Sequence, residues 1–161
     1  MYFRFRIKLE LYITAEGYTL PSGYILKELS ILFPNREYKH FIFKKPDSFI
    51  PTDKDNYTIR FTTDKLNQLS FTEGDIPYNI INDILTPYKD YRIYTYSYTF
   101  QKFLQNILPT TTLINIQSCG YKLPEYLPKP NCFKNHKARY CSLAKAKAVS
   151  RFVESGQYIE K

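Results

Sequence analysis

A chain of 161 residues has the usual size of one domain and can bury an apolar core without the help of disulfide bonds or metal ions. Its hydrophobic fraction of 43% argues against disorder. No apolar run approaches the ~18 residues of a membrane span, and residues 1–8 alternate apolar and basic side chains, unlike a signal peptide. We therefore expect an intracellular protein of the cytoplasm or nucleus, with one domain at 1–155, a short tail at 156–161 and no membrane partner.

The first part of the sequence predicts three strands in a meander. The expected strands are 3–14, 24–33 and 38–43. Residues 15–17, 21–23 and 34–35 carry turn signals. These connections are too short to hold a helix, so the three strands should be antiparallel.

The rest of the chain alternates helices and strands. Residues 47–55 indicate a loop, and 57–70 fit a strand or a helix equally. Further elements are expected in the order helix 77–85, strand 91–98, helix 99–108 with Thr99 as N-cap, strand 113–116 and helix 141–154 with Ser142 near its cap. Strands that follow helices should run parallel through right-handed crossovers. This order predicts an α/β fold of the ribonuclease H-like kind, with a five-stranded mixed sheet flanked by helices; a generic α+β sandwich is the alternative.

Positive charge is concentrated near the end of the chain. The net charge is +8, and segment 120–151 contains a single acid, Glu125. The positive residues of this basic segment are Lys122, Lys129, Lys134, Lys137, Arg139, Lys145, Lys147 and Arg151. Such a field favours a polyanion or an acidic partner, and a solvated face is the alternative. We expect these residues to bind nucleic acid through its phosphates, with DNA and RNA both open.

Two local strings resemble a known family. The string that begins at Tyr140 and continues Cys-Ser-Leu-Ala-Lys-Ala resembles the final motif of the DEDD-type 3′–5′ exonucleases, in which a His precedes a metal-binding Asp by five residues. Residues 27–32 and 40–46 resemble exonuclease-like reading frames of insect viruses and of transposon-derived insect genes. The resemblance covers most of the chain and implies a ribonuclease H-like fold and a viral or transposon origin.

The same resemblance implies that the catalytic chemistry is missing. The family holds two divalent metals with carboxylates, because hard cations prefer oxygen ligands and the metals clamp the attacking and leaving oxygens. Here Tyr140 occupies the position of the family's His, and Lys145 occupies the position of the following Asp. The first acidic pair falls nearest 10–12, where only Glu10 is an acid, and no acid stands at 99–101. We therefore expect no catalytic residues and a pseudo-nuclease, rather than an active nuclease with an atypical site.

The cysteines predict a structural zinc site. The expected ligands are Cys119, Cys132, His136 and Cys141, which include every Cys of the chain. An odd number of Cys does not suit a disulfide framework, whereas the short Cys-His-Cys spacing is close to that of small zinc sites. Three ordinary thiols and a surface His are the alternative.

These observations favour a catalytically inactive, exonuclease-like domain that binds nucleic acid through the basic segment. A viral or transposon-derived protein-interaction scaffold is the second hypothesis, because one fold can serve several functions. Salt dependence of nucleic-acid affinity would separate the two.

Overall fold

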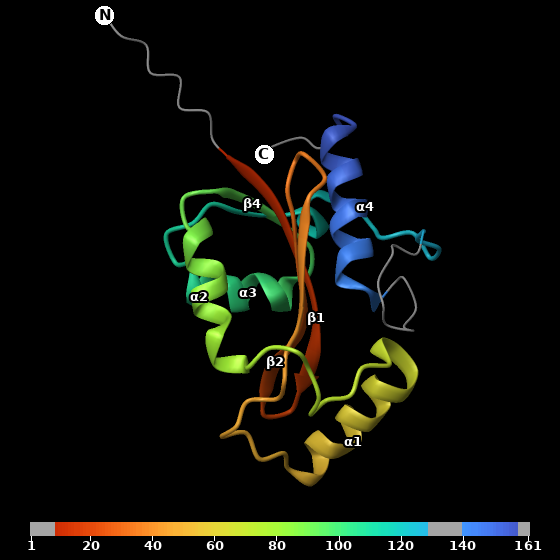
Figure 1. Cartoon of the computed structure of the whole chain (residues 1–161). Coiled ribbons are helices and arrows are strands. Elements are labelled where there is room, and N and C mark those ends of the chain that lie inside the picture. Colours follow the sequence, from red (N-terminus) through yellow and green to blue (C-terminus); the bar gives the residue numbers. More distant parts are fainter. Residues whose placement is uncertain (1–8, 129–139, 158–161) are drawn as a thin grey trace, which may run out of the picture.

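A computed structural model describes residues 9–128 and 140–157 (Figure 1). Its sheet has five strands in the order β3-β2-β1-β4-β5. The strands are β1 (Glu10–Leu20), β2 (Gly23–Leu32), β3 (Tyr38–Ile42), β4 (Arg92–Thr95) and β5 (Leu113–Asn115). The first three are antiparallel, β4 runs parallel to β1, and β5 runs parallel to β4. The predicted mixed sheet, with an antiparallel meander and two parallel strands, is confirmed.

Strand β1 continues through the first predicted turn, so the turn expected at 15–17 is wrong. The pairing with β2 shifts register between Glu16 and Gly17, which is the mark of a β-bulge. A Cβ atom on Gly17 would lie 2.4 Å from the hydroxyl oxygen of Tyr24. Glycine therefore lets the Tyr24 ring cross the bulge, and the strand turns only after Leu20.

In residues 9–128 and 140–157, four α-helices connect or follow these strands. They are α1 (Asp53–Thr62), α2 (Ile81–Leu85), α3 (Tyr98–Ile107) and α4 (Ser142–Glu154). Shorter helical segments are the π-helix η1 (Thr63–Asn67) and the 3₁₀ helices η2 (Tyr78–Ile80), η3 (Thr86–Tyr88) and η4 (Ile116–Cys119). The ambiguous segment 57–70 is thus helical in its first part. Helix α1 begins inside the predicted loop, because Thr52 and Asp55 form a capping box. Helix α3 is capped by Ser97 instead of Thr99.

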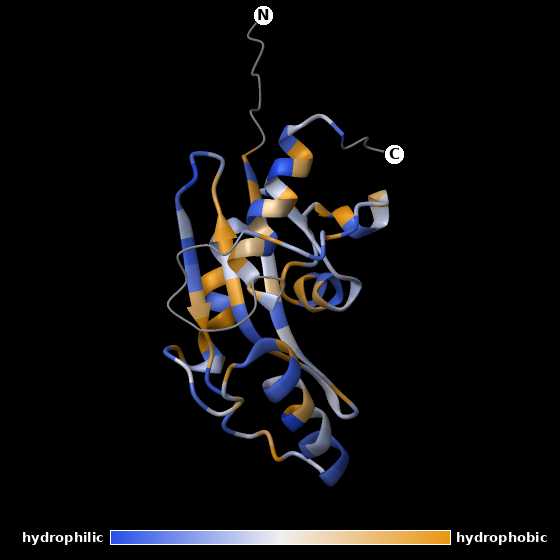
Figure 2. Cartoon of the chain, turned by 90° about the vertical axis from the view of Figure 1, so that its right-hand side faces the viewer, coloured by the Kyte–Doolittle hydropathy of each residue, from blue (hydrophilic) through white to orange (hydrophobic). Residues whose placement is uncertain are grey.

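Helices cover both faces of the sheet (Figure 1). Odd-numbered residues of β1, such as Leu11 and Ile13, pack with α2 and α3 in the larger core. On the opposite face Tyr12 packs with Ala146 and Val149 of α4. Figure 2 shows α4 lying across this face, with hydrophobic and hydrophilic residues along its length. Among the described residues, no helix is long and apolar enough to cross a membrane.

Candidate functional site

Polar side chains gather where the first turns of α4 meet the sheet. This polar cluster consists of Thr14 and Glu16 of β1, Glu28 and Ser30 of β2, His40 of β3, and Ser142 and Lys145 of α4. The side chains of Glu16 and Lys145 are each 13% exposed, and that of His40 is 6% exposed. The other four members are completely buried. Buried polar groups are costly unless they are paired, so their arrangement fixes how α4 sits on the sheet.

The Glu28 carboxylate caps α4 from a neighbouring strand. Its Oε1 accepts hydrogen bonds from the backbone N–H of Ser142 at 2.6 Å and from the Ser142 hydroxyl at 2.5 Å. The N–H groups of a first helical turn have no partner within the helix, and a negative charge there is favoured by the helix dipole. The N-cap residue, Cys141, makes no side-chain capping bond. Ser142 therefore is the first helical residue and not the cap that the sequence predicted.

Two further hydroxyls and an imidazole complete this contact. The Thr14 hydroxyl donates to the Ser142 carbonyl at 2.5 Å, and the Ser30 and Ser142 hydroxyls are 2.6 Å apart. His40 Nε2 lies 3.1 Å from Glu28 Oε1. A nucleophilic serine must reach its substrate, but Ser142 is completely buried. The group therefore attaches α4 to the sheet and does not form a hydrolytic site.

One turn further along α4, Lys145 forms an ion pair with Glu16. The Lys145 ammonium contacts Glu16 Oε1 and also donates to the Ala15 carbonyl oxygen at 3.2 Å. Burial raises the pKa of the Glu16 carboxyl above its ordinary value, and the positive charge of Lys145 opposes that rise. Lys145 is thus held against β1, whereas the sequence analysis expected it among the cations that bind phosphate.

Glu10, which the resemblance aligns with the first acidic pair of the family, does not contact Lys145. It is at the start of β1, where its Oε1 accepts a hydrogen bond of 3.1 Å from the Tyr94 hydroxyl. Glu16 is six positions further along the strand, which corresponds to about 20 Å. The acid that faces Lys145 is therefore Glu16. The sequence contained the signal, because Tyr12, Thr14 and Glu16 alternate along β1 on the α4 side.

The start of α3 carries a carboxamide where the sequence analysis found no acid. Gln101 Oε1 accepts a hydrogen bond of 3.0 Å from Asn115 Nδ2 at the end of β5. This bond joins α3 to the edge of the parallel part of the sheet. Neutral amides are weaker ligands for a hard divalent cation than carboxylates are, so this pair does not build a metal centre.

The structure describes two of the four expected zinc ligands. Cys119 is exposed at the end of η4, with its Sγ 3.6 Å from the Asn115 carbonyl oxygen. Cys141 is buried and packs with Leu127 and Leu143. Cys132 and His136 lie outside the described residues. Within the described part of the chain, no group of three or more His, Cys, Asp and Glu residues is placed to hold a metal.

The zinc site stays a prediction with a direct test. Protein purified without chelator is expected to contain one zinc per chain by elemental analysis, with Zn–S distances near ~2.3 Å and a Zn–N distance near ~2.0 Å by X-ray absorption. Because structural zinc contributes to folding, chelation should lower the unfolding temperature, and Cys132→Ser should reduce both zinc content and that temperature. Zinc-free protein with an unchanged unfolding temperature would show that these are ordinary residues.

Three cations of the basic segment lie on the described surface. Lys122 and Arg151 are exposed, and Lys147 is half-buried with its ammonium 5.9 Å from the centre of the Tyr38 ring. The remaining expected phosphate ligands are outside the described residues; they are Lys129, Lys134, Lys137 and Arg139.

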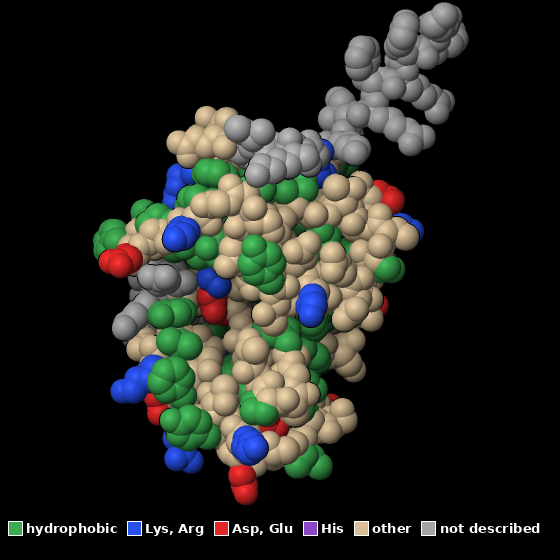
Figure 3. All heavy atoms as spheres, turned by 180° about the vertical axis from the view of Figure 1, so that it is seen from behind, with side chains coloured by type: hydrophobic (Ala, Val, Ile, Leu, Met, Phe, Trp, Pro, Cys, Tyr) green, Lys and Arg blue, Asp and Glu red, His purple; other side chains and the backbone are tan. Residues whose placement is uncertain are grey.

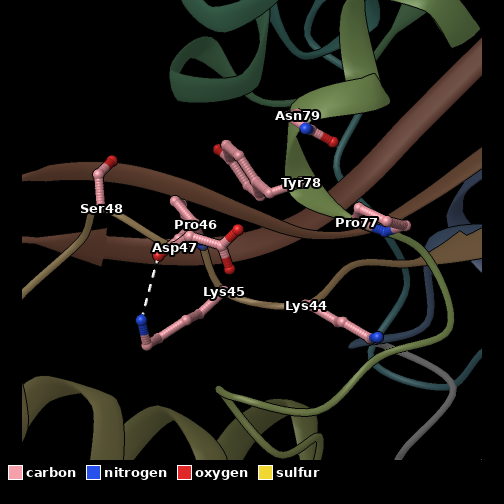
Figure 4. A pocket seen from close by; sticks show the side chains of 8 residues that line it. All are labelled: Lys44, Lys45, Pro46, Asp47, Ser48, Pro77, Tyr78 and Asn79. Atoms are coloured by element: carbon pink, nitrogen blue, oxygen red, sulfur yellow. Dashed lines mark hydrogen bonds between the residues drawn. The ribbon is translucent and has the colours of Figure 1, made fainter.

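A hollow outside the basic segment is lined by charged side chains of both signs, Lys44, Lys45 and Asp47. It has a volume of about 430 Å³ and lies between residues 44–48 and 77–79 (Figure 4). The Lys45 ammonium donates to the carbonyl oxygens of Pro46 at 3.1 Å and Phe49 at 3.3 Å. This lysine is therefore engaged by the backbone, and Asp47 adds a negative charge to the same wall.

No protein-family model matches the chain, and no curated protein and no solved structure matches it either.

Proposed function

We propose that this chain is a ribonuclease H-like, exonuclease-like domain that binds nucleic acid without cutting it. The observation that carries the proposal is the ion pair between Lys145 and Glu16. It joins the last helix to the first strand, where the resemblance to DEDD-type exonucleases expects carboxylates that hold metal ions. A lysine there supplies the positive charge itself, so it replaces a cation instead of binding one.

The strand order supports this assignment. A three-stranded antiparallel meander, followed by two parallel strands and a last helix, is the arrangement that the sequence analysis expected of a ribonuclease H-like fold. In the structure, α4 packs on β1. Under this proposal, the polar cluster is the counterpart of the exonuclease-like active site.

The side chains at this location do not fit a two-metal centre. Two divalent cations need several carboxylates to bind them and to offset their charge. On the α4 side of β1 stand Thr14 and Glu16, and α4 contributes Lys145. The start of α3 contributes Gln101. The two carboxylates of the polar cluster are both engaged, Glu16 by the Lys145 ammonium and Glu28 by the first residue of α4, so they do not supply the set of carboxylates that two such ions need.

Binding to nucleic acid is supported by the charge of the chain. The net charge is +8, and the basic segment carries most of it. Proteins with clustered Lys and Arg bind the phosphate backbone through counterion release, largely regardless of sequence.

The proposal predicts binding without digestion. Purified protein with Mg²⁺ or Mn²⁺ should retard labelled DNA or RNA in a gel while leaving its length unchanged, because no carboxylate set is available to activate a nucleophile. The matched control is Glu16→Gln, which should leave any trace of digestion unaltered. Metal-dependent digestion that Glu16→Gln abolishes would contradict the proposal.

A protein-interaction scaffold is the second candidate, and helix α1 favours it. Tyr57 and Phe61, one helical turn apart, are 76% and 51% exposed. Hydrophobic side chains lie on the surface over α1 next to Lys or Arg side chains (Figure 3, lower left). Exposed apolar patches of this kind often mark protein contacts. Failure of the chain to bind any nucleic acid at low salt would favour this candidate.

A further inference from the structure

A pocket with aromatic walls lies between residues 121–128 and the C-terminal half of α4. Its volume is about 270 Å³. Tyr121 and Phe152 stack on each other in its wall, with ring centres 4.4 Å apart and planes inclined by 20°. Tyr126 stands at the pocket with 85% of its surface exposed. An aromatic residue as exposed as this has a ring face available for stacking.

The charge of the pocket is positive. Arg151 is the only charged residue among the described residues that line it. Its guanidinium is close enough to Tyr121 to oppose the rise in the pKa of that phenol caused by burial. The nearest acid on α4, Glu154, pairs with Arg36 at 2.7 Å. Glu125 is exposed in the same loop but does not line the pocket.

Polar groups at the rim of the pocket can form hydrogen bonds with the edge of a heterocyclic ring. Ser155 and Gln157 line the mouth of the pocket and are both exposed. The Gln157 carboxamide can both donate and accept hydrogen bonds, whereas the Ser155 hydroxyl already donates to the Phe152 carbonyl oxygen at 2.7 Å and can offer only its oxygen as an acceptor. The pocket is smaller than the ~300–1,000 Å³ typical of sites for drug-sized ligands, so it suits one ring system.

We propose that this pocket holds one unpaired nucleobase of a single-stranded nucleic acid, with the Tyr126 ring stacked on the base and Arg151 bound to an adjoining phosphate. The inference rests on the proposed function and specifies its ligand. Bases in a duplex are paired and stacked, so they cannot enter such a pocket without being flipped out. Aromatic stacking and a cation beside it are the usual means of binding single strands.

The absence of Trp from the sequence makes a direct measurement possible. In Tyr126→Trp the only tryptophan of the protein is at the pocket, and a single-stranded oligonucleotide should quench its fluorescence by stacking. The matched control is Tyr57→Trp, which puts the reporter at a 76% exposed position on α1. Quenching of the control alone, or of neither variant by an oligonucleotide that binds, would overturn the inference.

Affinity gives the second measurement. Tyr126→Ala should weaken binding of a single-stranded oligonucleotide by about 5- to 150-fold, the loss expected for one stacked base. Its affinity for a duplex of equal length should change less than about 2-fold. Tyr57→Ala should change neither, and circular dichroism should show that both variants are folded.

The outcomes separate this inference from the proposed function. If the unmodified protein binds single strands and Tyr126→Ala binds them equally well, the pocket is not the base site, although the chain still binds nucleic acid. If the unmodified protein binds neither single strands nor duplexes at low salt, the proposed function itself fails, and the inference fails with it.

Discussion

Replacing Lys145 with Met is expected to lower the free energy of unfolding by about 3–5 kcal/mol at pH 7. The Glu16 carboxylate would then be buried without its partner, since both side chains are only 13% exposed. Removal of one member of a buried pair costs this much because the remaining charge has neither water nor a counter-charge. Urea denaturation followed by circular dichroism measures the difference.

Two controls separate this effect from a loss of packing. Lys147→Met, on the same helix but half-buried, should change the unfolding free energy by less than about 1 kcal/mol. The double variant Glu16→Leu/Lys145→Met removes both charges and should recover most of the stability, because apolar replacements of buried pairs are often neutral. A double variant as unstable as Lys145→Met would show that the two side chains stabilise the fold through packing and not through their charges.

The destabilisation should also depend on pH in a defined direction. Burial raises the pKa of Glu16 in the folded protein, and Lys145 opposes that rise. Without Lys145 the folded pKa should rise further above the unfolded value of about 4.3. A raised folded pKa means that the folded state binds the proton more tightly, so stability is retained below the unfolded pKa and is lost as pH rises through the folded one. Lys145→Met should therefore approach the unmodified protein near pH 4 and fall behind it toward neutral pH.

The arrangement of the sheet could be predicted because it depends on connection length and periodicity. Short polar connections force antiparallel neighbours, and intervening helices force parallel ones. Both rules hold here for all five strands. The sequence could not locate the end of β1, because Gly17 indicates a turn unless the Tyr24 ring that crosses it is known. A bulge is a property of the paired strands and not of one segment.

The candidate site was predictable in its chemistry but not in its partners. The sequence correctly indicated that Lys145 belongs to the last helix, because the residues around it have the pattern of a helix. The alternation along β1 carried the signal for Glu16 as the partner, but the turn predicted at 15–17 removed that residue from the strand. The sequence could not show that Glu28 caps α4 from more than a hundred residues away, since Ser142 beside the helix start was the simpler local explanation.

Affinity for duplex DNA is expected to fall by about 10²- to 10⁴-fold between 50 and 200 mM salt, which corresponds to roughly four to seven neutralised phosphates. The candidates are the cations of the basic segment other than Lys145, which the Glu16 carboxylate already holds. Each phosphate contact releases counterions, and added salt opposes that release. Fluorescence anisotropy with a labelled duplex, repeated over a salt series, gives the slope of log affinity against log salt.

Two variants that remove different cations show which residues produce the salt dependence. Changing Lys134, Lys137 and Arg139 together to Gln should flatten the slope by about 2–3, because three phosphate contacts are lost at ~0.9 each. The double variant Glu16→Leu/Lys145→Met should keep the original slope, because the lysine that it removes is held by Glu16 in the unmodified protein and does not contact phosphate. An unchanged slope in the triple variant would move the phosphate contacts to other cations of the chain. A flattened slope in the double variant would instead mean that Lys145 leaves Glu16 to meet phosphate, and the polar cluster would then be part of the binding surface.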